Sequence, residues 1–166
     1  SKRNPINPYG KTKLDDEFIA ESYSKDDVSI IGLRYFNVYG IGQTGSYAGV
    51  ITKFLEKIKE KKPLIVNGDG SQVRDFIHVI DIAKANVAAM ENKIKKGFFN
   101  IGTSIPTSIN DLAKIMISLS EQKLDIIHGT ELKGDVKISQ ANMEFTKKIL
   151  NWNHEIELKE GLKELI

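Results

Sequence analysis

Residues 28–36, VSIIGLRYF, form a nearly continuous run of apolar and β-branched residues. Such a run is typical of a strand that is buried on both faces of a parallel sheet. Apolar residues at helical spacing predict a helix on either side of it, over residues 9–23 and 48–62, and Pro63 ends the second. Strands and helices therefore alternate, which predicts an α/β fold with a mainly parallel sheet.

The rest of the chain continues this alternation. Further strands are predicted at residues 64–66, 73–79, 98–101 and 125–128. Further helices are predicted at residues 81–91, 108–120, 142–150 and 158–165. Asp81 is predicted to cap the first of these helices, and Ser108 the second, with Asp111 at the capping-box spacing.

The composition excludes several classes of function. A chain of 166 residues with 40% hydrophobic residues can form a stable core without disulfides or a structural metal. Its 24 basic and 22 acidic residues are too evenly balanced to predict a nucleic-acid or membrane surface. Cysteine is absent and the histidines lack ligand spacing, so no metal site is expected. No apolar run suggests a membrane span or a secretory leader, so we expect a cytoplasmic protein.

Tyr9 and Lys13 are four residues apart in PYGKTK, and on a helix they share one face. A free phenol titrates near pH 10, so it is a base at neutral pH only if a neighbouring cation stabilises the phenolate. Lowering a phenol pKa from about 10 to about 7 takes roughly 4 kcal/mol. A lysine one turn away can contribute to this, although the spacing taken alone favours the start of an ordinary surface helix.

The order of several motifs is more specific than any one of them. In this order the chain resembles the extended short-chain dehydrogenase/reductase family, and within it the 4-epimerases of UDP-glucose and UDP-N-acetylglucosamine. The motifs that carry the resemblance are PYGKTK, LRYFNVYG, GDGSQVRDFIHVIDIAKA, FFNIGTS, and a late KGD and LNW. It implies a Rossmann-like, doubly wound parallel sheet followed by a smaller α/β substrate-binding domain.

The resemblance assigns the chemistry to Tyr9 and Lys13. It implies that Tyr9 is the acid/base and that Lys13 binds the nicotinamide ribose of NAD and lowers the tyrosine pKa. The reaction it implies is reversible oxidation at C4 of a nucleotide-sugar. It also implies that Phe36 lies beside the nicotinamide and that Asn37 binds the diphosphate side of the substrate. From the residue alone, Asn37 could equally be the start of a turn.

The resemblance also implies a substrate site. Arg74 corresponds to an arginine that grips the UDP diphosphate, while the alternative from the sequence is an ion pair with Asp69 or Asp75. Gly49, Val50 and Val66 match the segments that surround the nucleotide base in the family. The alternative interpretation is that these residues serve only in the packing of a helix and a strand. The family usually has a second arginine where this chain has Leu132, so Lys133 is its candidate replacement. An ADP-heptose epimerase or a sugar-nucleotide 4,6-dehydratase therefore stays open.

The Gly-rich dinucleotide loop expected of this family is not present in the sequence. We therefore expect the chain to be the C-terminal portion of an epimerase. Residues 1–36 and 76–103 are interpreted as the remnant of the NAD-binding domain, and residues 37–75 and 104–166 as the substrate-binding domain. The full-length protein is expected to be a homodimer and the isolated chain to be inactive. A non-catalytic nucleotide-sugar-binding module is the alternative of another class.

Overall fold

The computed structural model describes residues 4, 5, 7–23, 28–43 and 49–166. Within these residues the chain has the expected α/β architecture, with strands paired mainly in parallel. The elements are, in chain order, α1 (Pro8–Tyr23), β1 (Ile30–Tyr35), β2 (Asn37–Tyr39), α2 (Val50–Lys59), β3 (Leu64–Asn67), β4 (Val73–Arg74), β5 (Phe76–His78), α3 (Val79–Glu91), β6 (Lys96–Ile101), β7 (Thr107–Ser108), α4 (Ile109–Ser120), β8 (Ile126–Gly129), α5 (Glu144–Leu150) and α6 (Leu158–Lys163).

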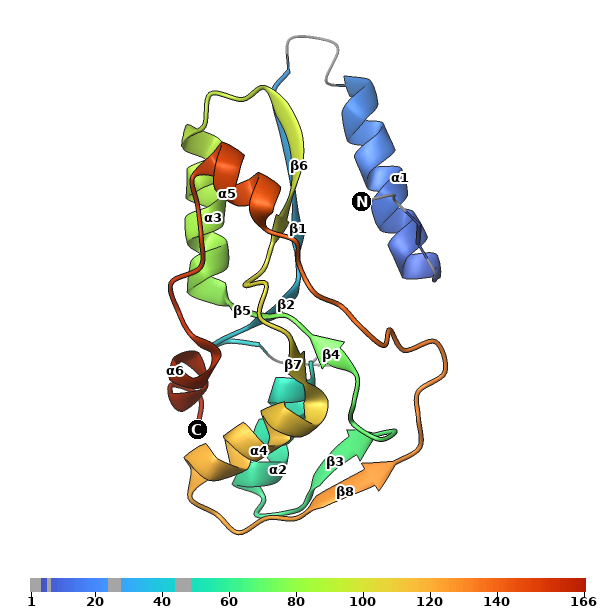
Figure 1. Cartoon of the computed structure of the whole chain (residues 1–166), viewed down its shortest axis with the longest axis vertical. Coiled ribbons are helices and arrows are strands. Elements are labelled where there is room, and N and C mark those ends of the chain that lie inside the picture. The colour runs from blue at the N-terminus through green and yellow to red at the C-terminus, as the bar shows by residue number, and fades with distance from the viewer. Residues whose placement is uncertain (1–3, 6, 24–27, 44–48) are drawn as a thin grey trace.

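The parallel pair β1–β6 is the centre of one half of the molecule, with Ile30 opposite Lys96 and Tyr35 opposite Ile101. Figure 1 shows α1 on one side of this pair and α3 and α5 on the other. A strand buried on both faces was predicted for β1, but none of its residues is fully buried. Among the described residues, β6 pairs with β1 on one edge only, and α1 has no buried residue. One side of β1 is therefore thinly covered.

The other half of the molecule surrounds a closed core, which we call the α2–α4 core. β3 pairs with β8 in parallel and β4 pairs with β7 in antiparallel orientation. On α2 the buried Ile51, Phe54 and Ile58 follow helical spacing and face this core. The buried residues of the α2–α4 core are Tyr39, Ile51, Phe54, Ile58, Leu64, Val66, Phe76, Ile109, Leu112, Ala113, Met116 and Leu162.

A second cluster, the α3–β6 core, lies beneath α3 and α5. Its buried residues are Ile77, Ala85, Ala89, Phe99, Ile101, Ala141, Met143, Leu150 and Trp152. Residues 141–152 thus pack against β6 and α3, although the sequence groups them with residues 104–166. They do so because α5 folds back onto β6, which places Thr146 Oγ1 2.7 Å from the carbonyl oxygen of Asn100. The division into two domains stays a prediction.

The start of α3 differs from the sequence-based prediction. His78, and not Asp81, is the N-terminal cap, and its Nδ1 accepts a hydrogen bond of 3.3 Å from the Ile80 amide. The predicted strand at residues 73–79 is two short strands, β4 and β5, separated by Asp75, whose buried side chain turns inward. The predicted cap of α4 is confirmed, because Ser108 Oγ accepts a 3.0 Å hydrogen bond from the Asp111 amide.

Candidate functional site

Tyr9 lies in the first turn of α1, directly after Pro8. Proline suits this position because its missing N–H would have no partner inside the helix. The Tyr9 side chain is 71% exposed, and the Lys13 ammonium lies 5.8 Å from the centre of its ring. The two side chains therefore share a face of α1, as the spacing predicts. Figure 1 shows α1 antiparallel to β1, so this first turn lies toward the carboxyl end of the strand.

Lys13 forms an ion pair with Asp16 in this structure. Lys13 Nζ donates a 2.9 Å hydrogen bond to Asp16 Oδ2, and both side chains are largely exposed. The hydrogen bond and charge of Asp16 raise the pKa of Lys13, so this lysine is a firm cation at neutral pH. An exposed ion pair of this kind is weak. Lys13 can therefore exchange Asp16 for another acceptor next to Tyr9.

Phe36 and Asn37 lie where β1 ends and β2 begins. The Phe36 amide donates to Ile101 O (3.0 Å) and the Asn37 amide donates to Asp75 O (2.9 Å). Phe36 packs against the α3–β6 core, and Asn37 is half-buried. In open α/β sheets ligands bind at the carboxyl ends of the strands, which is where both residues lie.

Arg74 is the most firmly held cation among the candidate residues, with a side chain that is only 13% exposed. Its Nη1 donates to the carbonyl oxygens of Val73 (2.8 Å) and Val136 (2.6 Å), and its Nη2 donates to Asp135 Oδ1 (2.5 Å). The ion-pair partner is thus Asp135, and neither Asp69 nor Asp75, which the sequence offered as candidates. Asp135 and Val136 lie 61 and 62 positions after Arg74 in the sequence, so local spacing could not predict these contacts.

The remaining predicted substrate residues occupy three different settings. Gly49 is exposed at the N-terminus of α2, and Val50 is half-buried next to it, while residues 44–48 lie outside the described residues. Val66 is fully buried in the α2–α4 core, so its side chain is closed to a ligand. Lys133 is exposed in a turn that the Asp135 amide closes on Leu132 O at 3.2 Å.

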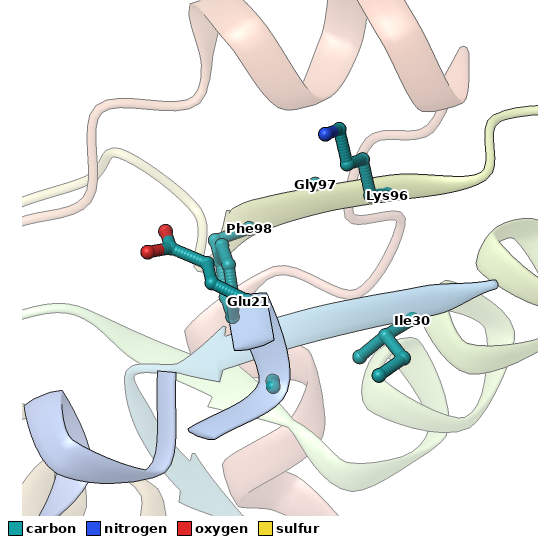
Figure 2. Close-up of a pocket in the computed structure, with 6 residues that line it drawn as sticks. Glu21, Ile30, Lys96, Gly97 and Phe98 are labelled. Carbon is teal, nitrogen blue, oxygen red and sulfur yellow. The ribbon is translucent and has the colours of Figure 1, made fainter. Parts of the chain in front are cut away.

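A cavity of about 370 Å³ lies away from these residues. It is lined by Ala20, Glu21, Ile30, Lys96, Gly97 and Phe98. Figure 2 shows it between the end of α1 and the starts of β1 and β6. It is therefore at the amino ends of these strands, opposite to the end that carries Phe36 and Asn37, and none of the candidate residues lines it.

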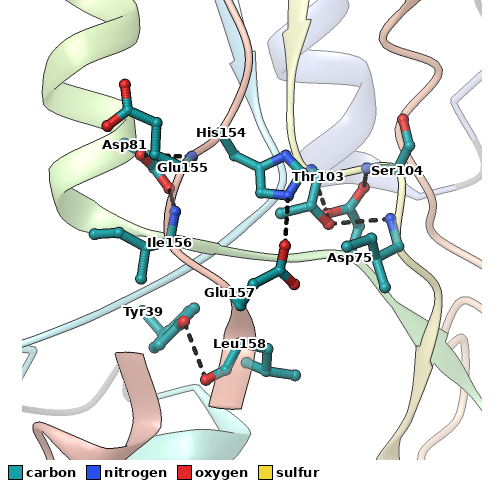
Figure 3. Close-up of polar contacts among 11 residues, drawn as sticks. Tyr39, Asp75, Asp81, Thr103, Ser104, His154, Glu155, Ile156, Glu157 and Leu158 are labelled. Atoms are coloured by element: carbon teal, nitrogen blue, oxygen red, sulfur yellow. Dashed lines mark hydrogen bonds and ion pairs between the residues drawn. The ribbon is translucent and has the colours of Figure 1, made fainter. Parts of the chain in front are cut away.

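Two buried aspartates, which the sequence did not single out as structural, accept hydrogen bonds from segments far along the chain (Figure 3). Asp75 accepts hydrogen bonds from the Thr103 amide and hydroxyl, the Ser104 amide and the Ala141 amide. Asp81 accepts from the amides of Glu155 and Ile156. A charge buried this deeply needs such partners. In the sequence, the feature that could have indicated these buried aspartates is their position directly before and after the mainly apolar run FIHVI.

Two negative findings concern the described part of the chain. It contains no group of three His, Cys, Asp or Glu residues that could hold a metal ion. In the same ranges, no helix combines the length and apolar character needed to cross a membrane.

Residues 1–102 match the model of the NAD dependent epimerase/dehydratase family, which is more than half of the chain. The chain belongs to this family. The match covers Tyr9, Lys13, Phe36, Asn37 and Arg74, so most of the candidate residues lie in the part of the sequence that establishes the membership.

Other members of the family extend the likeness over nearly the whole chain. The UDP-glucuronate 4-epimerase of Thermodesulfobacterium geofontis is 35% identical over 98% of this chain and 50% of its own length. A putative UDP-glucose 4-epimerase of Methanocaldococcus jannaschii is 36% identical over 98% of this chain and 53% of its own. The chain therefore spans about half the length of the curated relatives it matches.

A solved member of the family has the same fold. The UDP-glucose 4-epimerase of Thermotoga maritima, crystallised with UDP-glucose, superposes with a TM-score of 0.92 and is 34% identical. The superposition covers 96% of this chain and 52% of that one. The Rossmann-like α/β class predicted from the sequence is thereby confirmed.

Proposed function

We propose that this chain is the C-terminal portion of an NAD-dependent 4-epimerase that interconverts UDP-glucose and UDP-galactose or their N-acetyl forms. The observation that carries the proposal is the exposed pair Tyr9 and Lys13 in the first turns of α1, with the ammonium 5.8 Å from the ring centre. The substrate class is supported by relatives that are themselves named as 4-epimerases of UDP-sugars.

Tyr9 acts as the acid/base in the proposed reaction. Its phenolate accepts the proton of the C4 hydroxyl as that carbon is oxidised, and the phenol returns the proton when the carbon is reduced from the other face. Lys13 stabilises the phenolate by its positive charge. For this its ammonium must leave Asp16, to which it donates a hydrogen bond in the structure, and turn toward Tyr9. The pair thus holds and moves one proton, and both groups keep their positions because they are one turn apart on a helix.

The residues present fit one part of an NAD molecule. The hydroxyl of Tyr9 and the ammonium of Lys13 are exposed hydrogen-bond donors on one helix face, which suits the hydroxyls of a nicotinamide ribose. Phe36 supplies an aromatic surface at the carboxyl end of β1. When bound, NAD would supply the hydride acceptor and donor for C4. The Gly-rich loop that would hold its pyrophosphate is not in this sequence.

Arg74 is the proposed anchor of the substrate diphosphate, with Asn37 and Lys133 as further polar contacts. An arginine fork matches phosphate oxygens better than a lysine ammonium does. Gly49 and Val50 at the start of α2 and the backbone of Val66 are proposed to contact the nucleotide base. The exposed Leu132, where the family usually has arginine, favours testing ADP-heptose as an alternative substrate.

A homodimer through α1 is the proposed assembly of the full-length protein. Two large side chains of this helix that lie one turn apart are exposed, namely Ile19 (57%) and Tyr23 (63%). A second copy of α1 packed against this face would cover both side chains. Sedimentation of the full-length protein as a monomer would contradict this part of the proposal.

The test uses the full-length protein that contains this chain, assayed on UDP-glucose, UDP-N-acetylglucosamine and ADP-heptose. Tyr9→Phe should lower kcat about 10²–10⁴-fold, as expected for loss of a positioned acid/base. Tyr23→Phe is the matched control, because it removes the hydroxyl of another exposed tyrosine of α1. Full activity of Tyr9→Phe would refute the mechanism, and binding of UDP-sugars without turnover by the wild type would identify a non-catalytic module.

A further inference from the structure

The segment that follows Gly134 runs along β4 and forms part of the setting of Arg74. The Val73 amide donates to Lys137 O at 2.8 Å, and the Ser139 amide donates to Val73 O at 3.0 Å. Val73 thereby forms a parallel bridge with Ile138, while β7 pairs with β4 as well. β4 is thus held by two chain segments, and Asp135 is brought next to Arg74.

Two adjacent residues of this segment, Asp135 and Val136, accept hydrogen bonds from the two terminal nitrogens of the Arg74 guanidinium. Asp135 Oδ1 accepts from Nη2 and Val136 O accepts from Nη1, whose second proton goes to Val73 O. Among the described residues none accepts a hydrogen bond from Nε. The Arg74 side chain keeps 13% of its surface exposed. The guanidinium is therefore fixed at one end and open along its Nε side.

We propose that Asp135 is a positioning residue, which holds Arg74 so that its Nε side faces the diphosphate of the bound nucleotide. This inference rests on the proposed function. An arginine with a planar fork that is already oriented loses little conformational freedom when it binds phosphate. Without Asp135 the guanidinium keeps only carbonyl acceptors and can swing about its long side chain.

A carboxylate on an arginine has two opposite effects on anion binding. It orients the guanidinium, and it also offsets part of the positive charge that attracts phosphate. We expect orientation to dominate, because Asp135 is the only acceptor at Nη2 among the described residues and its loss leaves the guanidinium restrained at Nη1 alone. The two effects predict opposite changes in affinity, so they can be separated by substitution.

The experiment titrates the 166-residue chain with UDP and, separately, with uridine, and follows backbone amide resonances by NMR. Asp135→Ala should weaken UDP binding about tenfold, comparable with the loss of one charge-assisted hydrogen bond, and leave uridine affinity unchanged. Asp135→Asn keeps an oxygen acceptor at the same place and should retain most of the affinity. Glu60→Ala is the matched control, because it removes an exposed ion-paired carboxylate at the C-terminal cap of α2.

Each result decides between the alternatives. Unchanged or tighter UDP binding by Asp135→Ala refutes the positioning role while leaving the proposed function intact. An equal loss of uridine affinity refutes it as well, because that result indicates general damage to the site. Failure of the wild-type chain to bind UDP refutes the inference, whereas the proposed function is decided separately by the activity of the full-length protein.

Discussion

The two halves of the candidate site differ in how firmly the fold holds them. Tyr9 and Lys13 lie on α1, a helix without a single buried residue, and the contact of Lys13 with Asp16 is local and exposed. Arg74 is held by three hydrogen bonds to its guanidinium and lies beside the deeply buried Asp75. The proposed proton-transfer residues thus belong to the weakly packed region, and the proposed anion-binding arginine belongs to the firmly packed region.

This difference has a simple physical source. The α2–α4 core is closed by helices and strands that are all present in the chain, and Leu64, Val66, Leu112 and Met116 are completely buried in it. β1 has one neighbouring strand among the described residues, and α1 covers it loosely. Regions with few buried apolar contacts open at lower free energy than the core does. We therefore expect mutations to have unequal effects in the two regions.

The largest effect is expected for Asp75→Ala in the firmly packed region. The change leaves up to four buried or partly buried donors without their acceptor, and we expect a loss of about 3–5 kcal/mol in the free energy of unfolding. Urea unfolding followed by circular dichroism measures it. Asp69→Ala is the control: it removes a carboxylate that accepts two hydrogen bonds from Ser71 at an exposed turn, and it should cost much less. An equally small effect at Asp75 would mean that water replaces its contacts.

An intermediate effect, which changes with pH, is expected for Tyr39→Phe. Burial, followed by the charges of Asp81, Glu164 and Glu157, raises the pKa of Tyr39. Above the ordinary phenol pKa of about 10 the unfolded chain loses this proton and the folded chain keeps it, so stability falls as pH rises. The Phe variant lacks this loss, which is at most about 1.4 kcal/mol per pH unit.

Unfolding of the Tyr39→Phe variant should be compared with that of the wild type at pH 7 and near pH 11. At pH 7 the variant should be slightly less stable, because it loses the hydrogen bond from Tyr39 to Leu158 O (3.4 Å). The difference should shrink or reverse at the higher pH. Parallel curves for the two proteins would show that Tyr39 titrates normally. Tyr23→Phe, at an exposed position, controls for the loss of a phenol.

The smallest effect is expected for Ile19→Ala on α1. Ile19 is 57% exposed, so its truncation should change the free energy of unfolding of this chain by no more than about 0.5 kcal/mol. Ile58→Ala is the matched control in the α2–α4 core, where the side chain is 5% exposed and the expected loss is about 2–5 kcal/mol. Similar losses at the two positions would remove the contrast between the regions.

Much of the fold could be predicted from local patterns. The helices α1, α2 and α4 and the strand β6 lie where apolar periodicity and turn residues predict them, within a few residues. The cap of α3 could not, because a buried aspartate and a capping aspartate look alike in sequence. Asp81 is drawn inward by the amides of Glu155 and Ile156, and His78 caps the helix instead.

The candidate site divides in the same way. The sequence by itself determined that Tyr9 and Lys13 share a helix face, because four residues make about one helical turn. It also identified Arg74 as a candidate anion ligand through its motif. Only the tertiary structure decided that Asp135 is the partner of Arg74 and that the Val66 side chain is closed to ligands. Helical spacing is a local property of the chain, whereas burial and ion pairs between distant residues depend on which segments the fold brings together.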